Sequence, residues 1–173
     1  MITLFVEENN PLTPNFYNNL IANLQFHQLT CPCGHSGCLS IHGYYQRFVK
    51  TKEGKLPFRI CRVKCECCSH THAILLSSMV PYSQISLSDQ VCIITNHETS
   101  SSQTPLMEYN CSIDESNYRY VIKQYLKHWK QKLLCEKISL HPISTLTTSC
   151  FNFFSCQFMQ IKNTKNILFF NTT

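Results

Sequence analysis

The side chains best suited to chemistry in this 173-residue chain are cysteines, gathered in two short clusters. The first cluster runs from Cys31 to Cys38 and contains three thiols, and the second contains Cys65, Cys67 and Cys68. Thiolates carried on two tight turns are the usual ligands of a tetrahedral structural zinc ion. The spacing therefore predicts a structural metal site, and this part of the chain would be a scaffold rather than a place where bonds are broken.

The second cluster is the more regular of the two. Cys65 and Cys68 have the Cys-x-x-Cys spacing of zinc ligands. In the first cluster Cys33 and Cys38 have a tolerated spacing, Cys31 could instead pair with Cys38, and a single residue separates Cys31 from Cys33. We expect Zn²⁺ to be held by Cys33, Cys38, Cys65 and Cys68, with Cys31 as a reserve ligand. Nearby histidines that could replace a thiolate are His35, His42, His70 and His72.

Twelve cysteines would also suit a secreted disulfide scaffold. However, residues 1–8 lack the basic flank and the apolar run of a secretory signal, and no stretch has the roughly 18 apolar residues of a membrane helix. We therefore expect a cytoplasmic protein without membrane contact, whose reduced thiols bind metal. Cys67 is then a bystander or an alternative ligand. The scattered thiols expected to be small buried apolar residues are Cys92, Cys111, Cys135, Cys150 and Cys156.

The formal net charge of +5 is distributed unevenly along the chain. Residues 31–80 carry seven bases and two acids, and residues 114–137 carry six bases and three acids. Residues 81–113, between these two blocks, carry three acids and no Lys or Arg. Basic blocks on separate elements are expected of a nucleic-acid-binding protein, although a solvated charged face would explain either block alone.

The segments around the cysteines read as a small sheet. Aromatic, β-branched and basic residues over 39–64 predict two strands with a turn at 52–55, and residues 71–76 predict a third strand. A short helix over 13–26 can begin at Thr13, with Pro14 in its first turn. These elements would form a zinc ribbon with a helix packed against it.

Downstream of the ribbon, helices are expected over 86–97, 104–110 and 114–135, an order that suits a helix-turn-helix unit. The last helix has a possible capping box at its start, and a further amphipathic helix is expected over 145–161. The fold class is therefore α+β, a small zinc-ribbon sheet followed by a helical region. The expected divisions are a leader with a helix (1–30), the ribbon (31–80), the helix-turn-helix-like region (81–137) and an amphipathic tail (138–173). The long helix carries an apolar stripe of Tyr118, Ile122, Tyr125, Trp129 and Leu133 and a basic row of Arg119, Lys123, Lys127 and Lys130.

Five segments carry a resemblance to a known family: CPCGHSGCLSIHGYYQR (31–47), RICRVKC (59–65), THA (71–73), VPYSQ (80–84) and DESNYRYV (114–121). They resemble the bacterial family known as domain of unknown function 6431. Its members look like the zinc-ribbon and helix-turn-helix head of insertion-sequence transposases, detached from the catalytic part. The resemblance covers nearly the whole chain and implies a DNA-binding protein related to mobile elements. Ser69 stands where such ribbons usually have a glycine.

The residues and the resemblance together predict a zinc-stabilised protein that binds double-stranded DNA and has no catalytic domain. The ten acids show no spacing typical of a metal-binding triad, and no glycine-rich phosphate loop is present, so we expect no enzyme. The expected phosphate contacts on the hairpin are Arg47, Lys50, Arg59, Arg62 and Lys64, and those on the long helix are Arg119, Lys123, Lys127 and Lys130. The candidates for contacts with base edges are Asn117, Tyr118 and Arg119.

Two alternatives come from other classes of protein. The aromatic residues and the apolar tail would also suit an interaction adaptor that binds a transposase or a second copy of the chain. A thiol-redox enzyme is conceivable at Cys65-x-x-Cys68, but the βαβ context that would support it is missing.

Overall fold

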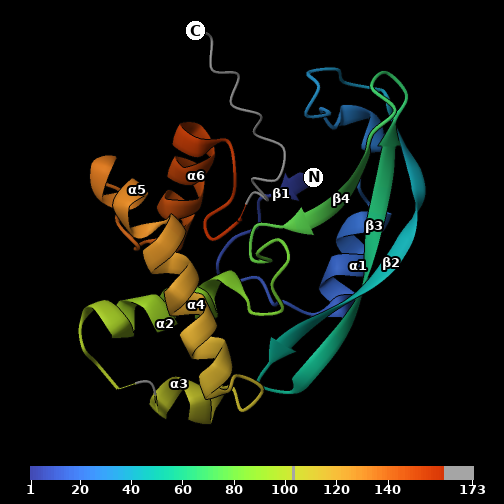
Figure 1. Ribbon diagram of the computed structural model, residues 1–173. Helices are drawn as coiled ribbons and strands as arrows, with labels where there is room; N and C mark the ends of the chain where they lie inside the picture. The colour runs from blue at the N-terminus through green and yellow to red at the C-terminus, as the bar shows by residue number, and fades with distance from the viewer. Residues whose placement is uncertain (103, 162–173) are drawn as a thin grey trace, which may run out of the picture.

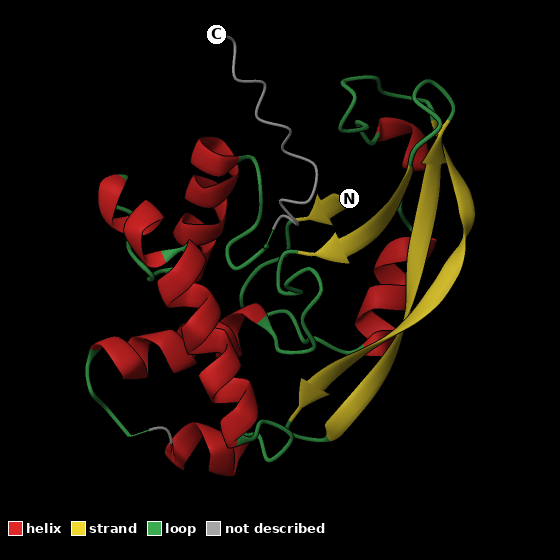
Figure 2. Cartoon of the chain, in the orientation of Figure 1, coloured by secondary structure: helices red, strands yellow, loops and turns green. Residues whose placement is uncertain are grey.

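The computed structural model describes residues 1–102 and 104–161 and has an α+β fold, in which a mixed sheet lies beside a group of helices (Figures 1 and 2). The predicted fold class is therefore confirmed. The four strands have the order β1-β4-β3-β2, with β1 parallel to β4 and the other pairs antiparallel. Their bounds are β1 (Ile2–Leu4), β2 (Leu39–Thr51), β3 (Gly54–Cys65) and β4 (Thr71–Leu76).

The hairpin of β2 and β3 is the longest feature of the sheet and agrees closely with the expected strands. Its register runs from the pair Leu39 and Cys65 to the pair Thr51 and Gly54, with a bulge between Ile41 and Gly43. Gly54 has a positive φ at the turn. Glycine adopts that backbone conformation without strain. Strands of this length span about 40 Å. The hairpin therefore connects the cysteine loops at one end with the helical region at the other (Figure 1).

The N-terminal segment is part of the sheet layer. Strand β1, which the sequence did not predict, pairs Ile2 with Ile74 and Leu4 with Leu76. The expected helix over 13–26 is shorter: α1 (Pro14–Ala22) begins after Thr13, whose side chain accepts from the N–H of Phe16 at 3.3 Å. A single 3₁₀ turn, η1 (Phe26–Gln28), follows it and leads to the first cysteine cluster.

The remaining helices form a second layer with its own apolar core. Two of them match expected helices, and the one expected over 145–161 ends at Phe154. The one expected over 114–135 is divided at Trp129, whose φ is −124°. The indole of Trp129 is buried and lies edge-on to the rings of Phe154 and Phe158, with centroid distances of 5.7 and 5.2 Å. The bounds are α2 (Leu87–Glu98), α3 (Thr104–Tyr109), α4 (Glu115–His128), α5 (Lys130–Cys135) and α6 (Ile143–Phe154).

Polar contacts join the two layers. The hydroxyl of Ser112 donates to the carbonyl of Thr51 at 2.9 Å, which fixes the tip of the hairpin just before α4. The side chain of Gln157, which is fully buried, donates to the carbonyl of Ser77 at 2.6 Å. The expected tail helix ends at Phe154, and the chain then turns inward through Ser155, which has a left-handed backbone. The end of the expected tail, residues 162–173, lies outside the described residues.

Candidate functional site

Two tight loops hold the clustered cysteines at one end of the hairpin. In the first loop the N–H of Cys31 donates to the carbonyl of His35 at 2.9 Å, and the N–H of Gly34 donates to the carbonyl of Cys31 at 2.8 Å. In the second loop the N–H of Cys65 donates to the carbonyl of His70 at 2.9 Å. Backbone hydrogen bonds within each loop thus close it without the help of a metal ion.

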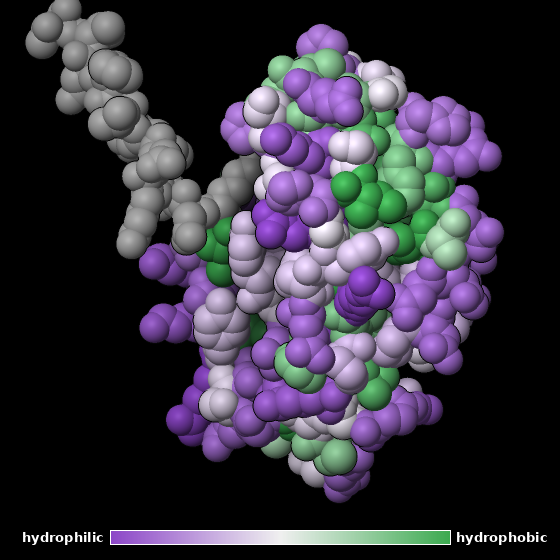
Figure 3. All heavy atoms as spheres, turned by 90° about the vertical axis from the view of Figure 1, so that its right-hand side faces the viewer, coloured by the Kyte–Doolittle hydropathy of each residue, from purple (hydrophilic) through white to green (hydrophobic). Residues whose placement is uncertain are grey.

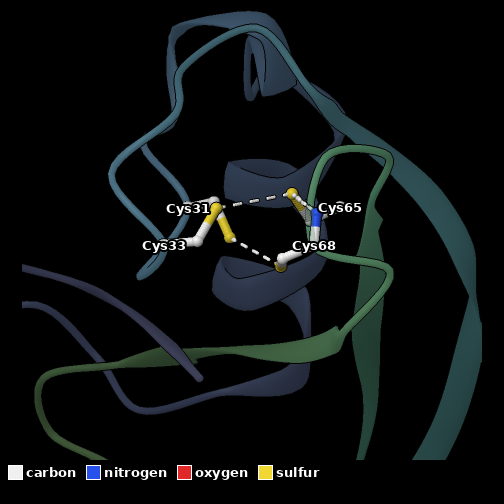
Figure 4. A group of neighbouring side chains, drawn as sticks. All are labelled: Cys31, Cys33, Cys65 and Cys68. Carbon is white, nitrogen blue, oxygen red and sulfur yellow. Dashed lines mark hydrogen bonds between the residues drawn. The ribbon is translucent and has the colours of Figure 1, made fainter.

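The closed loops bring four sulfur atoms together. Figure 4 shows Cys31 and Cys33 from the first loop turned toward Cys65 and Cys68 from the second. All four sulfurs lie within 4.8 Å of one another, with 3.7 Å between Cys31 and Cys68 and 3.8 Å between Cys33 and Cys65. A tetrahedral ion with Zn–S bonds of about 2.3 Å requires sulfur–sulfur edges of about 3.8 Å. The group is therefore compatible with a tetrahedral metal site.

Backbone N–H groups favour the charged form of these thiols. Those of Cys33, His35, Cys68 and His70 act in turn on Cys31, Cys33, Cys65 and Cys68, while burial raises the pKa of Cys31 to about 12. The N–H of Cys68, 3.4 Å from the sulfur of Cys65, lowers the pKa of that thiol to about 6. The N–H and the imidazole of His35 likewise lower the pKa of Cys33. Such donors stabilise the thiolate form that a metal ion binds.

The histidines lie outside the group of four. His72 has its Nε2 atom 3.4 Å from the sulfur of Cys31, and its Nδ1 atom 2.9 Å from the nitrogen of Met1. Because the Met1 nitrogen donates to Nδ1, the ring proton belongs on Nε2, which then donates to Cys31. Burial lowers the pKa of His72, which favours this neutral tautomer. His72 thus supports a ligand instead of replacing one, an arrangement common around metal sites.

Cys38, which the sequence favoured as a partner of Cys33, lies in a neighbouring group. It is buried, and its sulfur is 3.3 Å from that of Cys65. Together with Cys67 these two thiols form a second group within 4.8 Å that shares Cys65 with the first. Of the scattered cysteines, Cys150 and Cys156 are buried and Cys92 is half-buried as expected. The expectation of burial was wrong for Cys111 and Cys135, which are exposed.

Two of the expected phosphate contacts have internal roles. The guanidinium of Arg47 donates to the carbonyls of Val80 and Ser83, and its burial lowers its pKa. Lys50 is only 8% exposed and donates to the side chain of Asn117 at the start of α4. These two basic side chains therefore hold the loop after β4 and the hairpin tip in place, and neither is free for a phosphate.

The candidates for base contacts at the start of α4 are also engaged. Asn117 completes a capping box with Asp114, whose side chain accepts from the N–H of Asn117 at 2.9 Å. Tyr118 is half-buried, and its hydroxyl lies 3.3 Å from Nδ1 of His97. Arg119 is exposed and forms an ion pair with Glu115 at 2.6 Å. Of the three, only Arg119 projects from the surface.

On the hairpin, the other basic candidates lie nearer to solvent. The guanidinium of Arg59 stacks over the ring of Tyr44 at 4.2 Å. Arg62 is half-buried and donates to the hydroxyl of Thr71 at 3.1 Å, whereas Lys64 is exposed. These three residues lie on β3 of the hairpin and not on α4.

The basic row of α4 lies on the exposed side of the helix. Arg119, Lys123 and Lys127 recur every fourth residue and are all exposed, while Val121 and Tyr125 on the opposite side are buried. In the part of the chain that the structure describes, Lys123 and Lys127 form no ion pair. Lys130 continues the row but pairs with Glu98 at 3.0 Å. A shallow groove between α2 and α4 borders the row and is lined by His97, Tyr118, Arg119, Ile122, Lys123, Leu126 and Lys127.

Fold and site together define an α+β protein with a cysteine cluster that can hold a metal ion and a helix with an exposed basic row. The chain belongs to the family described as Domain of unknown function (DUF6431), whose model matches residues 31–119, just over half of the chain. No curated protein and no solved structure matches the chain. Within the described residues, none of the helices has both the length and the apolar character needed to cross a membrane.

Proposed function

We propose that this protein binds double-stranded DNA through α4 and that a structural zinc ion holds its cysteine loops together. The observation that carries the proposal is the exposed row of Arg119, Lys123 and Lys127, two of which lack an acidic partner among the described residues. Cations repeated along one face of a helix match phosphates repeated along a groove. The protein would act by binding, without a catalytic domain of its own.

The arrangement of the helices supports this proposal. Helices α2, α3 and α4 follow one another through short connections. The same order occurs in a helix-turn-helix unit, whose last helix enters the major groove. The connection before α4 is fixed by Asn110, which is buried and donates to Asp89 on α2 at 3.2 Å. A rigid connection keeps the orientation of α4 constant, which a recognition helix requires. Kinship with the N-terminal regions of transposases is part of the same proposal.

The cysteine cluster would serve as a scaffold. With four thiolates and no open position, a zinc ion there would be structural. It would fix the far end of the hairpin, whose tip contacts α4 through Lys50 and is bonded to Ser112 through Thr51. Arg59 and Lys64, exposed along the hairpin, are proposed as additional phosphate contacts outside the α4 row.

A salt series on duplex binding tests the role of α4. We expect the logarithm of the association constant to fall linearly with the logarithm of salt concentration, and Lys123→Gln or Lys127→Gln each to reduce that slope by about 1. Lys137→Asn is the matched control, since it removes the same charge beyond α5 at a residue with a left-handed backbone. Asparagine tolerates that conformation. A slope near zero for the native protein, or equal slopes for all four proteins, would overturn the proposal.

A second candidate function is supported by the edge of the sheet at β2, which the loop before α2 pairs with only at Lys50 among the described residues. Strand β2 is an edge strand, and its exposed large side chains are Ile41, Tyr44, Tyr45 and Phe48. Figure 3 shows this side of the molecule, where hydrophobic side chains lie among hydrophilic ones. Edge strands with exposed large apolar side chains can pair with other chains, so this surface would suit an adaptor that binds a transposase or a second copy. A stable complex in size-exclusion chromatography, with no affinity for duplex, would favour the adaptor.

A further inference from the structure

The cysteine loops contain more thiols than one tetrahedral ion can use. Four sulfurs, from Cys31, Cys33, Cys65 and Cys68, satisfy the geometry of a first ion. Cys38 and Cys67 are left over, yet both lie with Cys65 in a group whose sulfurs are all within 4.8 Å of one another. A single ion does not use these two additional thiols, which converge on one of its ligands.

The second group has the donor set of a metal site. Cys38 is 8% exposed and its sulfur is 3.3 Å from that of Cys65, so the two can close on one ion with little movement. The N–H of Glu66 donates to the carbonyl of Cys38 at 2.9 Å, which holds the two loops in register beside the sulfurs. The thiol of Cys67 is exposed and completes the group from the solvent side.

We propose that Cys38, Cys65 and Cys67 form a second zinc site, in which Cys65 bridges the two ions. The inference rests on the first zinc site of the proposed function. A thiolate sulfur has several lone pairs and can therefore bind two ions at once. The second divalent ion is accompanied by two added thiolates, so the net charge of the centre does not change.

The second site would differ from the first in its stability. It has three protein ligands, and water takes the fourth position on the exposed side of Cys67, whereas the first site is closed by four thiolates. Because Cys67 and the water face solvent, the second ion dissociates first when a chelator competes for it. The centre would thus lose its two ions in separate steps, and the fold would depend on the closed site.

The test is a titration of the reduced, metal-free full-length protein with Co²⁺, followed by the thiolate-to-cobalt absorption, with the bound metal counted by elemental analysis. We expect about two equivalents for the native chain and about one for Cys67→Ser. Cys67 is exposed, so this substitution removes a ligand without disturbing the core. Cys111→Ser is the matched control, because it removes an exposed thiol far along the chain. It should leave about two equivalents.

Each outcome has a distinct meaning. Saturation of the native chain at one equivalent, or two equivalents retained by Cys67→Ser, would overturn the second site while leaving the first intact. Failure of the native chain to bind any cobalt would overturn the first site as well, and with it the metal part of the proposed function. Withdrawal of the ions by a chelator in two separate steps, with Cys67→Ser losing the earlier step, would support the bridged pair.

Discussion

At the scale of single residues, the backbone of the second cysteine loop is strained at Ser69. Its positive φ places it in the left-handed region. A side chain costs energy there, and glycine does not. The sequence already indicated this position, because Ser69 stands where zinc ribbons usually have glycine. The backbone turns here so that the carbonyl of His70 can accept from the N–H of Cys65 at 2.9 Å. The loop therefore keeps its metal-binding shape despite an unfavourable residue.

Replacement of this residue should stabilise the protein. We expect Ser69→Gly to raise the free energy of unfolding by about 1 kcal/mol, since the relief of strain exceeds the entropy that glycine loses on folding. Urea denaturation of the metal-loaded protein would measure the change. Ser40→Gly, in the extended backbone of β2, is the control and should lower the same quantity by about 0.5–1 kcal/mol. Equal changes in the two variants would contradict this account of Ser69.

The choice among the first three cysteines could not be predicted from spacing. Spacing alone favoured Cys33 with Cys38, whereas the structure groups Cys31 and Cys33 with the second loop. The deciding interactions are the backbone hydrogen bonds that close the first loop. The internal roles of Arg47 and Lys50 could not be predicted from the sequence either. The residue type does not tell whether a basic side chain binds a phosphate or an oxygen elsewhere in the chain.

At the scale of elements, one buried hydroxyl of α1 is hydrogen-bonded to the sheet. Tyr17 is fully buried; its oxygen accepts from the N–H of Cys61 and donates to the carbonyl of Ile74, both at 2.9 Å. The last paired residues of β3 and β4 on this side are Arg62 and Ala73. The hydroxyl therefore takes the place of a direct hydrogen bond between the next two residues, Cys61 and Ile74. It bridges two strands where they separate.

Removal of the Tyr17 hydroxyl should destabilise the protein. We expect Tyr17→Phe to lower the free energy of unfolding by about 2–3 kcal/mol, because a buried N–H and a buried carbonyl would both lose their partner. Thermal or urea denaturation would measure the loss. Tyr120→Phe is the matched control, at an exposed position on α4. It should change the free energy of unfolding by about 0.5 kcal/mol at most. A similar small effect at both positions would show that water or a shifted strand replaces the bridge.

Elements with a strong local pattern were predicted well, and those that depend on tertiary contacts were not. The strand over 71–76 and the hairpin have the expected bounds. Alternation and a glycine turn specify them locally. The three residues of β1 are too few for a pattern and exist through pairing with β4. The division between α4 and α5 follows from the burial of Trp129 against two rings of the C-terminal region.

At the scale of the whole molecule, the sheet and the helical layer meet at a loop that presents Tyr82. This side chain is 91% exposed, and its backbone has a positive φ. Such a conformation is strained for a bulky residue. Arg47 holds the loop from the hairpin side through the carbonyls of Val80 and Ser83. On the other side a groove connects Tyr82 with Tyr120, which lies on the basic helix α4. The position therefore combines strain, exposure and a groove shared with the proposed DNA-binding element.

Backbone strain that is maintained at an exposed aromatic residue is expected at a functional site. Replacement of the residue should therefore raise the stability of the protein and weaken its binding to DNA. We expect Tyr82→Gly to raise the free energy of unfolding by about 1 kcal/mol through relief of the left-handed backbone. The same change should weaken duplex binding by about fivefold to tenfold, through loss of an aromatic contact worth about 1 kcal/mol or more. Denaturation and a binding titration at one salt concentration would measure the two effects.

Two controls separate the effect of the strained backbone from the effect of the aromatic ring. Ser100→Gly relaxes a comparable left-handed residue that follows α2. It should raise stability without changing DNA affinity. Tyr109→Ala removes an exposed tyrosine from α3, outside the proposed surface, and should leave affinity unchanged. If Tyr82→Gly raised stability and bound duplex like the native protein, the strain at Tyr82 would have no role in DNA binding. The loop would then serve only to connect β4 with α2.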